Sequence, residues 1–585
     1  MDKLWVAKQV DGQIPNDLHP NRHISKLLYQ RKITTKEEVE KFFNPKIEYL
    51  HYPFLMKDME KAVNRVEQAI TTKEKICVYG DYDVDGTTAV ALVYSFLESI
   101  GADLGFFIPD RYLDGYGLSK RGIDYAANHG VTLMIVLDCG IKAHEQVLYA
   151  KSKGIDVIIG DHHRPGDTLP DAFAVLDPKR NDCEYPYKEL SGCGVGFKLI
   201  QAYALQHDMD VRKNVYPLLD LVAVSIASDI VPLTDENRIL SYFGLMLLNT
   251  HPRPGIETIL NYSKVKRNSF PTLLAKGCNK PLYFNKELTN NDLVFFVGPR
   301  INAAGRMECG KNAVQLLLCK NLQEAEEIGK NINSFNTERK SLDHLATEEA
   351  LTQIEQNELL QTRYTTVVFD KSWNQGVIGI VASRLTESYY RPTIVFTESK
   401  SEEMLVGSAR SIKGFDIYDA IEACGDLLEH FGGHKYAAGL SIRPENFEKF
   451  SEAFEQIVTE TLQNKQMVPE IEIDDEVPFS DITNEFFEEL KKFAPFGPKN
   501  MNPIFKSVNV RDAGPSRRVG NNHLKLSLFQ ADTSSYPLNG IAFQQGDSFE
   551  DIKSGQPFSI CYHIEENEWN GTISTQLNIK DIKFN

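Results

Sequence analysis

The feature that most constrains the fold is a series of short apolar segments that alternate with helix-like stretches from Lys75 onward. The segments read KICVYG, LGFFIP, TLMIVLD, DVIIGD and FAVLDP. Such a rhythm is typical of βαβ units, which build a mostly parallel sheet. In parallel sheets of this kind, ligands bind beyond the carboxyl ends of the strands. We therefore expect the chemistry of this chain among the residues that directly follow the apolar segments.

Three carboxylates crowd the turn after the first segment. Asp81, Asp83 and Asp85 lie within the sequence GDYDVDG, and the next helix is expected to start near Thr87. Without a counterion these side chains would repel one another, so a bound cation is the simplest explanation for their spacing. The alternative is a solvated acidic turn or the N-terminal cap of a helix.

Further potential ligands follow other apolar segments. The third segment ends at Asp138, the fourth is followed by His162 and His163, and the stretch LVAVSIASD ends at Asp229. Each residue alone is explained by a turn, a helix end or a structural histidine, but their joint occurrence indicates a metal site. Oxygen ligands with an imidazole suit Mn²⁺ or Mg²⁺. One carboxylate shared by two ions about 3.5 to 4 Å apart would serve phosphoryl hydrolysis, so these residues indicate a metal-dependent phosphoesterase.

The overall charge limits how such a protein can meet a polyanion. A formal charge of −17 does not fit a protein that simply coats nucleic acid. Carboxylates that hold divalent cations can invert the local electrostatics, so an acidic phosphoesterase is reasonable. Nine cysteines without a CxxC pair favour reduced thiols, and the sequence shows neither a bilayer-length apolar run nor a secretory leader. We therefore predict a cytoplasmic protein.

The rest of the chain predicts further domains. A highly charged stretch with apolar residues at helical spacing is followed by a second alternating series, which includes TTVVFD and PTIVFT. Strand-like runs such as HLKLSLF and FSICYHI then predict a small antiparallel barrel or sandwich. We therefore predict an α/β protein with a mostly parallel first sheet, a connector helix, a second α/β domain and a C-terminal β-barrel. The expected parts are a lead-in at 1–70, the first α/β domain at 71–240, a helical connector region at 241–362, the second α/β domain at 363–460 and the barrel at 468–585.

The motifs, taken in order, resemble a known family. DYDVDG, LDCG, GDHH and ASDIVPL are similar in order and spacing to the signature of the DHH phosphoesterase superfamily. GPRINAAGR, GVIGIVASRL, GSARS, GGHKYAAG and PFGPKNMNPIF extend the resemblance to the RecJ family of single-stranded-DNA-specific exonucleases, over nearly all of the chain from Lys75. The resemblance implies a DHH domain that holds the metals, a DHH-associated domain that closes over the substrate, and an OB-fold that guides the strand.

This resemblance implies roles for the residues at matching positions. The implied metal ligands are Asp81, Asp83, Asp85, Asp138, His162 and Asp229. Asp138 is also implied as a catalytic residue shared by two ions, and His163 as the catalytic residue that contacts the scissile phosphate. The implied substrate-binding residues are Arg300, Asn302, Arg306, Ser408, Arg410, Gly433 and His434. Tyr79 and Asn374 depart from the pattern of relatives, and neither is included in the site.

The resemblance also implies an activity and partners. It predicts 5′-to-3′ hydrolysis of single-stranded DNA to mononucleotides, with two Mn²⁺ or Mg²⁺ ions, in repair and recombination. The implied partners are single-stranded DNA, a single-stranded-DNA-binding protein and a helicase, with no membrane, and the chain is expected to be a monomer. Basic residues and four aromatics of the barrel, Phe505, Phe529, Phe543 and Trp569, are candidates for contacting the strand or for filling the barrel core. The alternatives are a DHH phosphodiesterase for short oligonucleotides or cyclic dinucleotides, and an inactive replication scaffold.

Overall fold

The computed structural model describes residues 3–269, 274–275, 280–307, 310–399, 403–462, 467–530, 536–569 and 572–584. The chain divides into two compact units. The smaller unit comprises Met1–Leu4, Pro299–Leu316 and Gln323–Glu470, and the larger unit comprises Trp5–Gly298, Leu317–Leu322 and Ile471–Asn585. Within the described ranges, no helix has both the length and the apolar character needed to cross a membrane.

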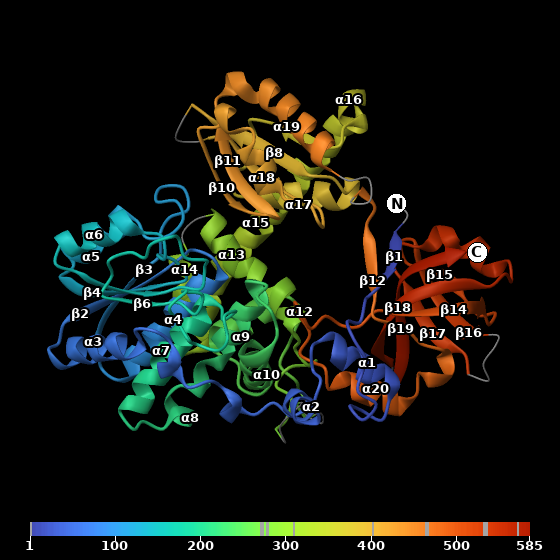
Figure 1. Cartoon of the computed structure of the whole chain (residues 1–585), viewed down its shortest axis with the longest axis horizontal. Coiled ribbons are helices and arrows are strands. Elements are labelled where there is room, and N and C mark those ends of the chain that lie inside the picture. The colour runs from blue at the N-terminus through green and yellow to red at the C-terminus, as the bar shows by residue number, and fades with distance from the viewer. Residues whose placement is uncertain are drawn as a thin grey trace. The chain divides into compact units, whose positions relative to one another are not determined.

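A parallel sheet lies at the centre of the first part of the larger unit (Figure 1). Its order is β3 (Asp103–Phe107), β2 (Lys75–Gly80), β4 (Val131–Leu137), β5 (Asp156–Gly160) and β6 (Ala174–Leu176). Every neighbouring pair is parallel. The central strands are buried almost throughout because helices cover both faces, which explains their continuous apolar runs.

Two groups of helices cover this sheet. One face packs against α5 (Lys120–Asn128) and α6 (His144–Ser152). The other face packs against α3 (Met59–Thr71), α4 (Val84–Ser99) and α7 (Gly192–Gln206). Further helices of this unit are α8 (Val211–Asn214), α9 (Leu219–Ser228), α10 (Asp235–Thr250), α11 (Pro254–Tyr262) and α12 (Asn290–Asp292). α9 packs against both α4 and α7, so three helix ends meet near the carboxyl edge of the sheet.

The smaller unit is built around a mixed sheet and a long helix. The sheet order is β10 (His430–His434), β11 (Ala437–Ile442), β9 (Leu405–Arg410), β8 (Thr393–Glu398) and β7 (Thr366–Phe369). The remaining elements are α13 (Gly298–Met307), α14 (Lys311–Leu318), α15 (Leu322–Glu355), α16 (Glu358–Thr362), α17 (Ile378–Tyr389), α18 (Ile417–Glu422) and α19 (Phe447–Thr461). α15 and α17 share one apolar core with the sheet, and α18 and α19 share another. The predicted connector helix is therefore present as α15.

A closed barrel forms the C-terminal part of the larger unit. Its five strands are β14 (Phe505–Asp512), β18 (Phe558–Trp569), β19 (Thr572–Phe584), β17 (Leu538–Ala542) and β16 (His523–Gln530). β14 pairs with both β18 and β16, and this second pairing closes the ring. The other C-terminal elements are β12 (Glu470–Ile473), β13 (Asp475–Glu476), α20 (Asn484–Lys491), β15 (Arg517–Val519) and α21 (Phe549–Lys553). The predicted fold class is confirmed.

The N-terminal segment, which the sequence describes only as a lead-in, completes the core of the C-terminal module. Its elements are β1 (Leu4–Ala7), α1 (Arg22–Gln30) and α2 (Lys36–Phe43). Ile24 and Leu27 on α1 are fully buried in one cluster with Phe486 and Phe493 of the C-terminal module. Helix α1 and the C-terminal module therefore share one apolar core.

Candidate metal centre

Helix α4 presents the acidic motif that follows β2. The helix begins at Val84, earlier than the expected start at Thr87. Asp83 is its N-cap, and the Asp83 Oδ1 accepts a hydrogen bond from the backbone N–H of Gly86 at 3.1 Å. Asp85 follows in the first turn. Asp83 is therefore the N-terminal cap that the alternative interpretation describes, and the acidic motif lies at the positive end of the helix.

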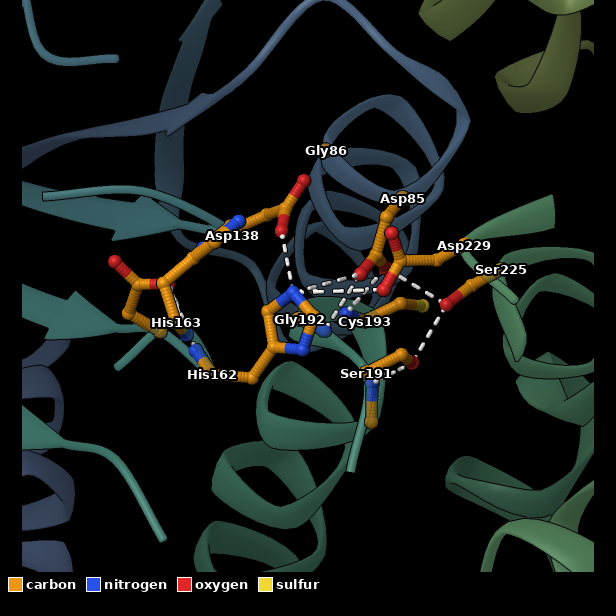
Figure 2. A network of polar contacts seen from close by, with 12 residues as sticks. Asp85, Gly86, Asp138, His162, His163, Ser191, Gly192, Cys193, Ser225 and Asp229 are labelled. Carbon is orange, nitrogen blue, oxygen red and sulfur yellow. Dashed lines mark hydrogen bonds and ion pairs between the residues drawn. The ribbon is translucent and has the colours of Figure 1, made fainter. Parts of the chain in front are cut away.

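Asp85 is fixed by donors from two other helices. Its Oδ2 accepts a hydrogen bond from the Gly192 N–H at 2.7 Å, and its Oδ1 accepts one from the Cys193 N–H at 2.8 Å. The Ser225 hydroxyl donates to the same Oδ1 at 2.7 Å (Figure 2). The first two donors open α7 and the third lies on α9, so the packing of these helices on α4 sets the carboxylate position.

Asp138 leaves the end of β4 in a left-handed conformation with a φ of 61°. Its backbone N–H donates to the Gly160 carbonyl at 2.9 Å, which extends the pairing of β4 with β5. The side chain lies directly against Gly192, where an added Cβ would be 2.6 Å from the Asp138 Cβ. Side-chain carbons do not approach so closely, so the position requires glycine. The start of α7 thus sets the positions of both Asp85 and Asp138.

His162 lies among three carboxylates, as Figure 2 shows. Its Nε2 is 3.2 Å from the Asp138 Oδ1 and 3.5 Å from the Asp229 Oδ2. The Asp85 Oδ2 is 3.7 Å from the same nitrogen. The residue is 6% exposed, neither ring nitrogen has a hydrogen-bond partner within the described ranges, and burial lowers the pKa of the imidazole. A buried neutral imidazole that faces carboxylates is suited to bind a metal.

Asp161 orients the neighbouring His163. The Asp161 Oδ1 lies 2.8 Å from the His163 Nδ1, and its Oδ2 accepts from the Ile141 N–H at 2.9 Å. Burial alone would raise the pKa of Asp161, but the contact with His163 holds it at about 2. Burial opposes the charge on His163, yet the hydrogen bond to Asp161 raises its pKa to about 9. The His163 Nε2 lies 3.2 Å from the Tyr116 hydroxyl, so a cationic imidazole is held beside the carboxylate cluster.

The carboxylates of the cluster carry unfavourable charge in the absence of a cation. Burial raises the pKa of Asp138 well above its usual range, and repulsion from Asp85 adds to this effect. Burial and the same neighbour raise the pKa of Asp229 to about 8. A divalent cation among these groups would replace repulsion by attraction. The donor set therefore fits a hard cation such as Mn²⁺ or Mg²⁺.

The ligand atoms also lie close enough together for such a cation. Asp138, His162 and His163 each offer one ligand atom within 4.8 Å of the others. Asp85, His162 and Asp229 form a second group by the same measure. His162 belongs to both groups, and the structure therefore places three other predicted metal ligands, Asp85, Asp138 and Asp229, around its imidazole.

The other two predicted ligands, Asp81 and Asp83, lie outside those groups. Asp81 is 1% exposed, and its Oδ1 accepts a hydrogen bond from the Gly117 N–H at 3.4 Å. Its Oδ2 is buried and has no hydrogen-bond partner in the described part of the chain. Burial, followed by repulsion from Asp83, raises the pKa of Asp81 to about 8. An unpaired buried carboxylate oxygen beside the cluster is consistent with a nearby cation.

The predicted residues of the GPRINAAGR motif lie on α13, in the smaller unit. Arg300 is 7% exposed, and its Nε donates to the Asn333 Oδ1 on α15 at 3.2 Å. Arg306 donates from Nη1 to the Gly376 carbonyl at 2.9 Å. Asn302 is half-buried between them on the same helix. The structure therefore groups the three residues, with both arginines anchored within their own unit.

Arg410 and His434 lie on one face of the mixed sheet. Ala437 pairs with Arg410 on one side and with His434 on the other, and directly opposed residues of antiparallel strands share a face. The hydroxyls of Ser408 and Ser383 accept hydrogen bonds from the Arg410 guanidinium, each at 3.1 Å. No ion pair neutralises Arg410 among the described residues, and burial lowers its pKa. A desolvated guanidinium without a carboxylate is suited to bind an anion.

Gly433 and the departures from the family pattern have local explanations. Gly433 has a φ of 147°, and an added Cβ would lie 2.5 Å from the Ala437 carbonyl oxygen. The Tyr79 hydroxyl is buried and donates to the Gly117 carbonyl at 2.7 Å. The Asn374 Oδ1 accepts from the Gly376 N–H at 2.8 Å and so closes a turn. Neither departure adds a group to the metal centre.

The four barrel aromatics differ in position. Phe505 is 1% exposed and belongs to the barrel core, so stacking on a base is excluded for it. Phe529 is half-buried, whereas Phe543 is 54% exposed and lies at the end of β17. The side chain of Trp569 lies outside the described residues. Phe543 therefore stays the best-placed candidate for base stacking.

Several residues of the centre escaped the sequence interpretation. Asp161 could have been found because it is an acidic residue directly before the two histidines. Gly192 could have been found because it lies in the glycine-rich sequence SGCGVG, where a helix starts. Ser225 and Tyr116 carry no such signal, because their contacts join positions far apart in the chain. These residues orient the predicted ligands.

Comparison with known proteins identifies the family. The family model described as the DHH family, N-terminal domain, matches residues 75–226, the DHHA1 domain matches 361–460 and the RecJ OB domain matches 473–581. The single-stranded-DNA-specific exonuclease RecJ of Bacillus subtilis (strain 168) is 36% identical over 585 residues, which cover 99% of this chain and 70% of that protein. The chain belongs to the RecJ family.

Two further RecJ proteins support this assignment. RecJ of Escherichia coli (strain K12) is 33% identical over 595 residues, which cover 98% of each chain. A crystal structure of RecJ in complex with Mn²⁺ from Thermus thermophilus is similar, with a TM-score of 0.78 and 25% identity, over 96% of this chain and 76% of that one. The RecJ family thus includes a structure that contains one of the cations suited to the carboxylate cluster.

Proposed function

We propose that this chain is a metal-dependent exonuclease that degrades single-stranded DNA from the 5′ end to mononucleotides in DNA repair and recombination. The observation that carries the proposal is the buried His162, whose Nε2 faces three carboxylates at 3.2 to 3.7 Å. The substrate class comes from the relatives, which are named single-stranded-DNA-specific exonucleases.

The carboxylate cluster would hold two Mn²⁺ or Mg²⁺ ions. The residues that would bind them are Asp85, Asp138, His162 and Asp229, with Asp81 and Asp83 as further oxygen donors. Asp138 is our candidate for the ligand shared by both ions. When bound, such ions activate water and stabilise the charge that develops on the phosphate.

His163 would bind the scissile phosphate. Its raised pKa of about 9 keeps the imidazole cationic at neutral pH, and Asp161 fixes the ring through Nδ1. The Nε2–H is then free to donate to a phosphate oxygen in place of the Tyr116 hydroxyl, which lies 3.2 Å away. A charge-assisted hydrogen bond of this kind strengthens as negative charge accumulates on the phosphate.

The strand would be held through its phosphates at two groups of residues in the smaller unit. Arg300, Asn302 and Arg306 on α13 form one group, and Ser408, Arg410, Gly433 and His434 on the mixed sheet form the other. Arginine binds phosphate through two parallel hydrogen bonds, and glycine lets the backbone approach a ligand closely. The barrel would contribute an exposed aromatic, Phe543, and basic side chains along the strand.

The setting of the protein is also part of the proposal. We propose that it acts in the cytoplasm as a monomer on single strands that a helicase exposes and a single-stranded-DNA-binding protein covers. We include both partners because an enzyme that acts only on single strands depends on other proteins to provide those strands.

The test compares substrates and metals with the full-length chain. End-labelled single- and double-stranded oligonucleotides and a dinucleotide are incubated with Mn²⁺, with Mg²⁺ or with a chelator. We expect metal-dependent loss of the single strand from its 5′ end and resistance of the duplex. Cleavage of the dinucleotide alone would instead favour a small-substrate phosphodiesterase, and bound Mn²⁺ without any hydrolysis would favour an inactive scaffold.

A further inference from the structure

A loop of the C-terminal module contacts the segment that carries Asp229. This loop, residues 493–500, includes the first six residues of the PFGPKNMNPIF motif. The proposed function assigns no role to that motif. The backbone N–H of Leu233, shortly after Asp229, donates to the Pro498 carbonyl at 2.7 Å. An added Cβ at Gly497 would lie 3.2 Å from the Leu233 Cδ2, so the loop also packs directly on this side chain.

The loop is held in shape by Asn500, which is 1% exposed. Its Nδ2 donates to the carbonyls of Phe493 at 2.8 Å and Pro495 at 2.9 Å. Its Oδ1 accepts from the Arg31 Nε at 2.7 Å, and its backbone pairs in both directions with Gly497. One side chain therefore fixes both arms of the loop that meets Leu233.

Arg238 lies on α10, which follows the segment that carries Asp229, and it forms hydrogen bonds with the start of the same loop. Its guanidinium donates to the carbonyls of Phe493 and Lys492, each at 3.0 Å, and to the Phe42 carbonyl at 2.9 Å. The residue is 4% exposed and forms no ion pair with any described residue, so burial lowers its pKa to about 9. The planar guanidinium holds its donors in a fixed fork that reaches these three carbonyls at once, which gives this buried cation a specific positioning role.

The segment between Asp229 and α10 needs such support. Ile230 has a φ of 58°, an unfavourable conformation for a β-branched residue, and its side chain is 68% exposed. A strained residue persists only where its surroundings determine the chain path. On one side the Pro232 carbonyl accepts from the Tyr187 hydroxyl and the Asn237 Nδ2, each at 3.0 Å. Loop 493–500 supports the same segment through the hydrogen bond from the Leu233 N–H to the Pro498 carbonyl.

We infer that loop 493–500 is a positioning element of the metal centre, in which Asn500 and Arg238 act as positioning residues that hold Asp229 in place. The inference rests on the proposed metal centre, because it concerns the position of one of its ligands. It adds a second role for the C-terminal module, which would set metal affinity in addition to contacting the strand.

The experiment uses the full-length, metal-stripped chain and its Asn500→Ala and Arg238→Lys variants. Tyr562→Phe is the matched control, because it removes a buried hydrogen bond of 2.7 Å to Ser507 in the same module without touching the loop. Mn²⁺ affinity is measured by calorimetry, stability by thermal denaturation, and dinucleotide hydrolysis across a Mn²⁺ series. We expect Asn500→Ala to weaken Mn²⁺ binding by about 10-fold, as loss of groups that orient ligands commonly does. Its hydrolysis should fall at limiting Mn²⁺ and recover at saturating Mn²⁺, while Tyr562→Phe keeps the wild-type affinity.

The outcomes separate this inference from the proposed function. Wild-type Mn²⁺ affinity in a folded Asn500→Ala variant would overturn the inference. An equal loss of affinity in Tyr562→Phe would also overturn it, because the effect would then be general destabilisation. If the wild type binds Mn²⁺ but cleaves no single strand, the proposed function fails while calorimetry still decides the inference. Should Arg238→Lys not fold, Asn500→Ala decides alone.

Discussion

Gly192→Ala should inactivate the enzyme by displacing two ligands without removing either. An alanine Cβ at this position would lie 2.6 Å from the Asp138 Cβ, 2.8 Å from its Oδ1 and 2.9 Å from its Cα. Carbon atoms in comfortable contact are about 3.5 to 4.0 Å apart, so Asp138 or the start of α7 must move by about 1 Å. Rotation of the Asp138 side chain cannot relieve the contact, because the Cα is also too close. The same movement would stretch the hydrogen bond from the Gly192 N–H to Asp85, now 2.7 Å long.

The expected effect is large on catalysis and modest on folding. A misplacement of about 1 Å can cost about 100-fold in rate, so we expect a loss of that order in kcat at saturating Mn²⁺. Overpacking typically costs about 1 to 3 kcal/mol of stability, which a domain of this size tolerates. The assay is digestion of a 5′-labelled single strand, with circular dichroism and thermal unfolding as checks of the fold.

Gly194→Ala is the matched control on the same helix. An added Cβ there meets its nearest atom, the Ser191 Oγ, at 3.4 Å, which is ordinary contact. Replacing glycine by alanine within a helix is favourable by about 1 kcal/mol, so this variant should be at least as stable as the wild type and fully active. The reasoning is refuted if Gly192→Ala keeps more than about a tenth of the wild-type kcat, since that would mean the site tolerates the displacement.

Three further predictions concern separate parts of the molecule. Asp138→Ala should abolish hydrolysis while single-strand binding survives, because loss of a carboxylate shared by two ions would disturb both ion sites. Activity near the wild-type rate in a folded variant would contradict the shared role. Arg410→Ala should weaken strand binding and leave Mn²⁺ affinity unchanged by calorimetry; a collapse of metal affinity would place Arg410 among the ligands. Burial opposes the charge on His23, but hydrogen bonds to Asp475 and Asp481 raise its pKa above 6.5, so its stabilisation is complete below pH 6.5 and is lost as the pH rises through the raised pKa. Urea unfolding across this range should therefore show a flatter pH dependence for His23→Gln, and an unchanged slope would show that the ion pair contributes nothing.

The sheet and the acidic ends of its strands were predictable because both depend on local sequence. Buried parallel strands need continuous apolar runs, and the topology then places the residues after each run at one edge. The strand-like runs of the C-terminal module likewise predicted an antiparallel barrel or sandwich, and the pairing of β14 with β16 in the structure decides for a closed barrel. The sequence pattern places the start of α4 too late, because it assigns Asp83 and Asp85 to a turn although they cap and open the helix.

The contacts that arrange the ligands were not predictable because they join distant parts of the chain. Gly192 meets Asp85 and Asp138 only after α7 has packed on α4, and nothing near Gly192 in the sequence indicates either partner. The same holds for α1, whose apolar face could have packed on any domain but lies in the barrel core. Periodicity shows that a face is buried, whereas the partner depends on the tertiary fold.

These long-range contacts change how the C-terminal module can be studied. The family resemblance implies that this module guides the strand, and none of the predicted metal ligands lies in it. Removing it would, however, take away the carbonyls of Phe493 and Lys492 that hold the buried Arg238, and would expose the apolar side chains of α1. A buried cation that loses its partners is strongly destabilising, so a truncated chain would lose metal chemistry and stability together. A role of the barrel in strand binding is therefore better tested by substitutions on the barrel surface, such as at the exposed Phe543, which leave the loop and its contacts with α10 intact.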